Sequence, residues 1–188
     1  DMIKFIWSVE VGKEIGAVCG EMLKPVLLEL GGKDPMIVLE DANLERAANA
    51  AIWGGMTNCG QICISVERVY VIDSVADEFV ELIKKKVKHI KFGPNKDQMD
   101  MGSLADDRQH AIVLNHINNA KNKGANISAG GEDREDLGGY FIAPTVIENV
   151  NYDMKIMQSE TFGHEISIMR VKDEKEAKNK SNDKTNGL

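Results

Sequence analysis

Short apolar runs of strand length alternate along this chain with segments whose apolar residues recur at helical spacing. The runs fall at residues 3–7, 25–30, 35–39, 68–72, 125–129, 141–147 and 166–171. Runs that are apolar at nearly every position are typical of strands covered on both faces of a sheet. The alternation therefore predicts an α/β fold of three layers (α/β/α), with helices on both faces of a mostly parallel sheet.

Composition limits the classes of partner. The chain has 188 residues, of which 43% are hydrophobic, so it can bury a substantial core. Its net charge of −7 makes nucleic acid and anionic membranes poor candidates as main partners. The sequence also contains no run of roughly 18 apolar residues, the length that a membrane-spanning helix needs. We therefore expect neither nucleic acid nor a membrane as a partner.

Cysteine and histidine usage gives expectations about location and metals. Three cysteines, an odd number, do not form a disulfide framework and suit a reducing, cytoplasmic setting. Neither they nor the four histidines have the spacing of a zinc site, so we expect no metal. The chain starts within a strand-like run and ends just after a helical one. We therefore expect a fold truncated at both ends, a piece of a longer protein.

Polar residues stand before the first two helical segments, where their side chains can cap the helix. Ser8 precedes the first segment, and either Asp41 or Asn43 precedes the second. A different kind of marker, Pro144, interrupts the apolar run at residues 141–147. Because proline cannot donate to a strand ladder, this run is expected to be an edge strand or an irregular one.

Cys63 ends a small, polar turn that starts at Asn58 and follows a helical segment. A helix beginning directly after this turn would place the sulfur at a helix N-terminus, where a thiolate is stabilised. Cys63 is thus a candidate nucleophile, and the alternative is a small buried hydrophobic residue, as most free cysteines are. Cys19 and Cys59 are interpreted as structural.

Glu29 places one carboxylate inside an apolar run, which Gly31 and Gly32 then end. A desolvated carboxylate has a raised pKa and can act as a general base near neutral pH. The alternative is a glutamate on the polar side of a half-exposed strand, paired with a lysine such as Lys33. The residues alone leave both interpretations open.

Two stretches together resemble the signature segments of the aldehyde dehydrogenase superfamily, the NAD(P)-dependent oxidoreductases. They are Leu-Glu-Leu-Gly-Gly-Lys-Asp-Pro at residues 28–35 and Asn-Cys-Gly-Gln-Ile-Cys at residues 58–63, in the order and at the separation of that family. Further similarities lie at residues 8–12, 100–102, 139–145, 160–163 and 182–188. The resemblance covers essentially the whole chain, and the paired Glu and Cys motifs are highly specific.

The resemblance implies an enzyme that oxidises an aldehyde to a carboxylic acid with NAD or NADP as cofactor. Cys63 would be the nucleophile, forming a thiohemiacetal and then a thioester, and Glu29 would be the general base. The residues implied in cofactor binding are Ser8, Gly12, Leu30, Glu160 and Phe162. Among these, Ser8 would lie near the pyrophosphate, and Glu160 with Phe162 would lie at the nicotinamide end.

The resemblance also implies a division of the chain. Residues 1–29 would be the C-terminal remnant of a dinucleotide-binding domain, and residues 30–188 a catalytic domain incomplete at its C-terminus. The isolated chain is then expected to show little or no turnover, and the whole enzyme is expected to be a homo-oligomer.

Two residues depart from the family pattern, because Trp7 and His164 stand where the family usually has glycine and proline. A bulky Trp7 side chain would crowd the approach of the pyrophosphate, and His164 is interpreted as a drifted loop residue or, less simply, as a proton shuttle. These departures leave an alternative function open, that of a non-catalytic, decayed homologue acting as a binding or assembly module.

Overall fold

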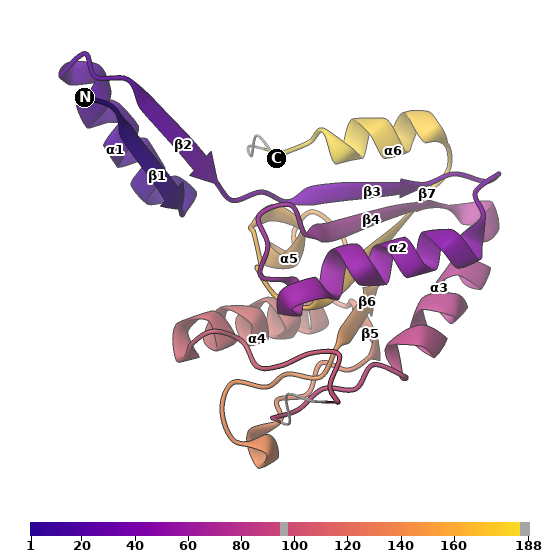
Figure 1. Ribbon diagram of the computed structural model, residues 1–188. Coiled ribbons are helices and arrows are strands. Elements are labelled where there is room, and N and C mark those ends of the chain that lie inside the picture. Colours follow the sequence, from indigo (N-terminus) through magenta and orange to yellow (C-terminus); the bar gives the residue numbers. More distant parts are fainter. Residues whose placement is uncertain (95–97, 185–188) are drawn as a thin grey trace.

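Two parallel strands joined by a helix form the first unit of the fold. The computed structural model describes residues 1–94 and 98–184, apart from the side chain of Trp7, so the expectation that Trp7 crowds a cofactor lies outside the described atoms. Strand β1 (Ile3–Trp7) pairs in parallel with β2 (Val26–Leu30), and helix α1 (Val9–Glu21) connects them. This unit projects from the rest of the molecule in Figure 1.

The second sheet has five strands in the order β3-β4-β7-β6-β5. Their bounds are β3 (Asp34–Val38), β4 (Val66–Ile72), β5 (Asn126–Ala129), β6 (Thr145–Glu148) and β7 (Glu165–Val171). All neighbouring pairs are parallel except β5 with β6, which is antiparallel. The predicted mostly parallel α/β fold is confirmed.

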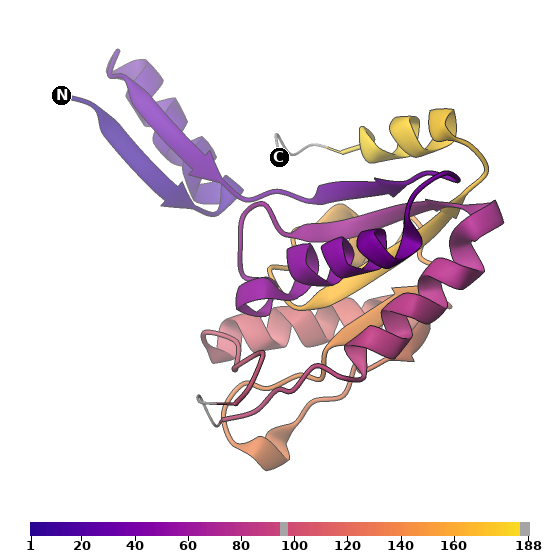
Figure 2. The same cartoon turned by 45° about the vertical axis from the view of Figure 1, so that its right-hand side comes forward.

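Helices cover both faces of this sheet, as the three-layer prediction requires (Figures 1 and 2). On one face lie α2 (Leu44–Met56) and α3 (Asp73–Val87). On the other lie α4 (Asp107–Asn122), α5 (Lys155–Gln158) and α6 (Glu174–Ser181). Two short 3-10 helices, η1 (Thr57–Gly60) and η2 (Glu135–Leu137), complete the set of described elements. No helix in residues 1–94 or 98–184 is both long and apolar enough to cross a membrane.

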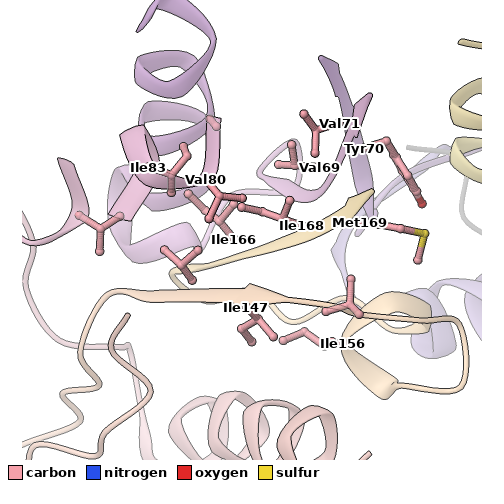
Figure 3. Packing of buried hydrophobic residues seen from close by; sticks show 14 of the residues in the cluster. Val69, Tyr70, Val71, Val80, Ile83, Ile147, Ile156, Ile166, Ile168 and Met169 are labelled. Atoms are coloured by element: carbon pink, nitrogen blue, oxygen red, sulfur yellow. The ribbon is translucent and has the colours of Figure 1, made fainter. Parts of the chain in front are cut away.

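Alternation along the central strands divides the core between the two faces, as Figure 3 shows. Val69 and Val71 of β4 point toward Val80 and Ile83 of α3. Tyr70, between them, points the other way, and its hydroxyl donates to the backbone oxygen of Lys180 in α6 at 3.3 Å. These side chains are almost completely buried. The continuous apolar runs in the sequence therefore reflect strands that need apolar side chains on both faces.

The structure decides between the expected caps and corrects one strand. Ser8 caps α1, accepting from the backbone N–H of Val11 at 3.5 Å, and Asn43 rather than Asp41 caps α2. The run around Pro144 is not an edge strand, because β6 lies between β7 and β5. It is irregular, as the other alternative expects: the strand begins only at Thr145, and the register of its pairing with β5 shifts between Ile127 and Ala129. Proline is tolerated there because it immediately precedes the first residue of β6, so no ladder hydrogen bond is lost.

Candidate active site

Three chain segments meet at one edge of the five-stranded sheet, where parallel strands begin. Residues 31–33 lead into β3, residues 57–65 into β4, and residues 160–164 into β7. Since β3, β4 and β7 are adjacent and parallel, their amino ends lie side by side. The predicted Cys63 and Glu160 therefore belong to loops that enter neighbouring strands, although 97 positions of sequence separate them.

The carboxylate of Glu160 lies directly over the glycine pair between β2 and β3. A Cβ atom on Gly31 would stand 1.9 Å from Glu160 Oε2, so only glycine leaves room for this carboxylate. The backbone N–H of Gly32 donates to Glu160 Oε1 at 3.3 Å. Burial raises the pKa of the Glu160 carboxyl, with a further contribution from the nearby charge of Glu67. The glycine pair therefore not only ends β2 but also leaves room for the Glu160 carboxylate.

The segment after Glu160, which we call the 160–162 turn (residues 160–162), is held from two sides. Glu67 accepts the backbone N–H of Thr161 at 2.8 Å and that of Phe162 at 2.9 Å. The side-chain amide of Gln109 donates to the carbonyls of the same two residues, at 2.6 and 2.9 Å. Phe162 has a φ of 54°, a left-handed conformation that costs about 1–3 kcal/mol and persists only where its surroundings fix it.

A buried polar cluster supports this turn from below. The ammonium of Lys33 donates to the carboxylate of Glu67 and, at 2.9 Å, to Thr161 Oγ1, and Lys33 is completely buried. Glu165 Oε1 lies 3.9 Å from the same ammonium, and burial together with the charge of Glu67 raises the Glu165 pKa to about 8. On the far side, His116 Nδ1 lies 3.0 Å from Thr161 Oγ1, and burial lowers the His116 pKa to about 4. His116 is therefore neutral at pH 7.

The turn that carries Cys63 packs directly against the loop of residues 160–164. After α2 the chain takes three successive left-handed residues, Asn58 (φ 53°), Cys59 (φ 60°) and Gly60 (φ 70°). A Cβ atom on Gly60 would stand 2.0 Å from the backbone oxygen of Gly163, so the two loops touch through their backbones here. Gln61 anchors the other side, because its Oε1 accepts the backbone N–H of Ala105 at 2.9 Å.

Cys63 is exposed, whereas Cys19 and Cys59 are buried. The condition for a thiolate stabilised by a following helix is not met: a turn follows Cys63, and β4 begins at Val66. The interpretation of Cys63 as a buried hydrophobic residue is wrong. Cys59 fits its structural interpretation, since its thiol donates to the Gly102 oxygen at 3.5 Å and burial raises its pKa.

Glu29 is exposed, so the expected desolvation of its carboxylate is wrong. The physical reason is strand alternation: α1 covers the face of β2 that carries Leu28 and Leu30, and Glu29 points to the other face. The suggested pairing with Lys33 is also wrong, because the Lys33 ammonium is turned inward to Glu67. Neither Glu29 nor Cys63 has a side-chain hydrogen bond to another described residue.

The remaining candidates lie apart from the Cys63 turn, in the first unit and beneath the loops. Gly12 packs against Leu30, since a Cβ atom on Gly12 would stand 2.5 Å from Leu30 Cδ2. Ser8 stands at the N-terminus of α1. His164 lies in the loop before β7, as the first interpretation expects, but it is buried and its Nε2 donates to the Ile142 oxygen at 2.7 Å. Burial lowers the His164 pKa. Within the described residues, no group of three or more His, Cys, Asp or Glu side chains could hold a metal ion.

Sequence reasoning missed Glu67 and Gln109, which bind the backbone of the 160–162 turn. Glu67 directly precedes the apolar run predicted at residues 68–72, and a charged residue in that position carries no local sign of burial. Gln109 lies on a polar side of its helix, where nothing in the local pattern separates it from a solvated residue. A signal is present in the pair Glu67-Arg68, two adjacent charges at the start of a run whose remaining residues are apolar or aromatic.

Comparison with known proteins gives consistent matches along the whole chain. The family model described as the aldehyde dehydrogenase family matches residues 1–188. A Mycobacterium tuberculosis protein, provisionally named as an NADP(+) succinate-semialdehyde dehydrogenase, is 41% identical over 189 residues, which cover 100% of this chain and 36% of that protein. This chain therefore spans little more than a third of the length of that relative.

Solved structures agree with this match. A provisionally assigned aldehyde dehydrogenase from Anabaena variabilis superposes with a TM-score of 0.97 at 41% identity, over 100% of this chain and 40% of that one. Betaine aldehyde dehydrogenase from Staphylococcus aureus, solved in complex with NAD+, superposes with a TM-score of 0.93 at 35% identity, over 100% of this chain and 38% of that one.

The backbone contact between the two loops gives a first prediction. Gly60→Ala should lower the free energy of unfolding by at least about 2 kcal/mol, because the residue is left-handed and its new methyl group meets the Gly163 carbonyl. Urea titration measures this change. Gly102→Ala is the matched control, since its Cβ meets nothing within 4 Å, and its effect should stay within about 0.5 kcal/mol. Equal effects of the two variants would contradict the close packing.

Glu165 gives a prediction of pH dependence. Its folded-state pKa of about 8 lies above the usual value of 4.5, so the folded state binds the extra proton, and the stability that this confers is lost as the pH rises through 8. Between pH 6.5 and 9, wild type should lose stability relative to Glu165→Gln by an amount on the order of 1 kcal/mol. His116 does not titrate in this window. Parallel unfolding curves for the two proteins would rule out a protonated Glu165.

Proposed function

We propose, because the chain belongs to the aldehyde dehydrogenase family, that it carries the thiol-bearing part of an enzyme that oxidises an aldehyde to a carboxylic acid with NAD or NADP. The observation that carries the proposal is the exposed Cys63 on a turn packed, through Gly60 and Gly163, against the loop of Glu160. The name of the M. tuberculosis relative includes NADP(+), and the S. aureus structure contains NAD+. Both cofactors are therefore included in the proposal.

Cys63 acts as the nucleophile in this proposal. Its sulfur attacks the carbonyl carbon of the aldehyde, and a thiohemiacetal forms on the enzyme. The backbone N–H of Cys63 stabilises the oxygen that becomes negative. Oxidation converts the thiohemiacetal to a thioester, whose hydrolysis releases the acid and returns the free thiol. The exposure of Cys63 supports this role, because a substrate can reach its sulfur without a movement of the core.

Glu29 acts as the general base, taking a proton from the thiol, from the hydrolytic water, or from both in turn. Its carboxylate is free of other partners among the described residues and is two positions away from Gly31, on which Glu160 lies.

Glu160 and Phe162 contribute to binding the nicotinamide end of the cofactor. Glu160 Oε1 accepts the Gly32 N–H, and Oε2 accepts no hydrogen bond from the described residues, so an acceptor remains for a ribose hydroxyl. Because Gly31 has no Cβ atom, there is room for this oxygen at its position beside the backbone. When bound, the cofactor supplies the hydride acceptor for the oxidation. Ser8, at the N-terminus of a 13-residue helix, suits the pyrophosphate, and Gly12 and Leu30 suit the surface beside it.

The division into residues 1–29, a remnant of the dinucleotide-binding domain, and residues 30–188, part of the catalytic domain, belongs to the same proposal. The break between the two sheets after Leu30 supports it. Much of the cofactor site then lies in the two thirds of the relatives' length that this chain does not span. For that reason turnover is proposed for the full-length protein, a homo-oligomer, and little or none for the chain alone.

Removal of the thiol tests the proposal in the full-length protein that carries this chain. Cys63→Ala should reduce NAD(P)-dependent aldehyde oxidation by at least about 10³-fold, because no covalent intermediate can form. Cys19→Ala is the matched control and should leave the rate nearly unchanged, because Cys19 is buried in α1 away from both loops. The rate is measured as reduced cofactor formed with a panel of aldehydes.

Two outcomes would contradict it. Turnover that persists in Cys63→Ala would remove Cys63 from the mechanism. A folded wild-type protein that oxidises no aldehyde with either cofactor would favour the decayed binding or assembly module. Alkylation of Cys63 ahead of Cys19 does not separate these cases, because their difference in exposure already accounts for it.

A further inference from the structure

Glu67 makes contacts that the proposed chemistry does not use. Its two carboxylate oxygens accept from two consecutive backbone N–H groups, Oε2 from Thr161 at 2.8 Å and Oε1 from Phe162 at 2.9 Å. One side chain thereby fixes the orientation of both peptide units that follow Glu160. These hydrogen bonds span 94 and 95 positions of sequence. The orientation of the turn therefore depends on a distant residue, which belongs to β4.

Lys33 fixes Glu67 in turn. The Glu67 side chain is 3% exposed and that of Lys33 is 0% exposed, so each charge depends on the other to remain inside the protein. The Lys33 ammonium also donates to Thr161 Oγ1, and its backbone oxygen accepts from the buried Arg68 at 2.8 Å. Lys33 directly follows Gly32, the residue whose N–H binds the Glu160 carboxylate. The ion pair therefore connects the segment that binds the Glu160 carboxylate, at Gly32, with the 160–162 turn that carries Glu160.

Glu165 does not compete for this role. Burial raises its pKa to about 8, which leaves it mostly protonated at pH 7, and neither of its oxygens has a hydrogen-bond partner among the described residues. Glu67 is thus the carboxylate that the Lys33 ammonium binds. Each of its two oxygens accepts one N–H group of the turn, which a side-chain amide, with a single acceptor oxygen, cannot reproduce in the same geometry.

We propose that Glu67, held by Lys33, is a positioning residue that orients Glu160 and Phe162 for the nicotinamide end of NAD(P). The inference rests on the proposed function, since it takes these two residues as cofactor contacts. Glu67 itself touches no reacting atom and acts only through the backbone of the 160–162 turn. It therefore sets the affinity for the cofactor rather than the reactivity of Cys63.

The test separates orientation of the turn from general stability. In the full-length protein, Glu67→Gln replaces one acceptor oxygen by a donor and leaves Lys33 without its anion. The double variant Lys33→Met/Glu67→Gln removes the unpaired charge as well, and so should regain thermal stability. We expect the Kd for NAD+ or NADP+, measured by calorimetry without substrate, to rise about tenfold or more in both variants. The unfolding temperature should fall only in the single variant.

Glu176→Gln is the matched control. Glu176 also accepts a backbone N–H, from Lys172 at 2.9 Å, and also lies near a lysine, Lys180 at 3.7 Å, but it belongs to α6. Its Kd should stay within about twofold of wild type.

The contradictory outcomes are distinct. If the double variant regains the wild-type Kd together with its stability, Glu67 has a structural role only and the inference is overturned. An unchanged Kd in a folded Glu67→Gln protein overturns it too. A folded wild-type protein that binds neither NAD+ nor NADP+ overturns the proposed cofactor contacts and this role with them.

Discussion

The buried ion pair between Lys33 and Glu67 is the interaction on which the candidate site depends. It joins the segment before β3 to the start of strand β4, and through Thr161 and Phe162 it reaches the segment before β7. Removing one partner of such a pair typically costs about 3–5 kcal/mol, because the remaining charge stays buried without compensation. The ion pair thereby fixes the segments that enter β3, β4 and β7 relative to one another, at the edge of the sheet where these strands begin.

This location is unusual for a parallel sheet. Ligands of open α/β sheets generally bind outside the carboxyl ends of the strands, at a switch in strand order. Here the loops that carry Cys63 and Glu160 enter β4 and β7 at their amino ends, beside the glycine pair that enters β3. The polar groups that make this edge rigid are buried, whereas Cys63 and Glu29 are exposed. In the proposed function, positioning and reactivity therefore belong to different side chains.

Local sequence patterns predicted the strands, the cap at Ser8 and the three-layer architecture, because each depends on neighbouring residues. They left Glu29 open between a buried and a half-exposed position, since its exposure depends on which face of β2 a helix covers. They predicted the strand that follows the Cys63 turn, but could not exclude a helix directly after Cys63. They could not find Glu67, whose partners lie 34, 94 and 95 positions away. The roles of the site residues remain predictions, which the motifs of a known family supplied.

If Cys63 carries the substrate during oxidation, an acyl enzyme can be trapped on it. The full-length protein is mixed with an aldehyde and NAD(P)+, quenched in acid within the first turnover, digested, and analysed by mass spectrometry. The peptide containing Cys63 should gain the mass of the acyl group only when aldehyde and cofactor are both present. An acyl group on Cys19 or Cys59, or continuing turnover with no acylated Cys63 at any quench time, would contradict this role of Cys63.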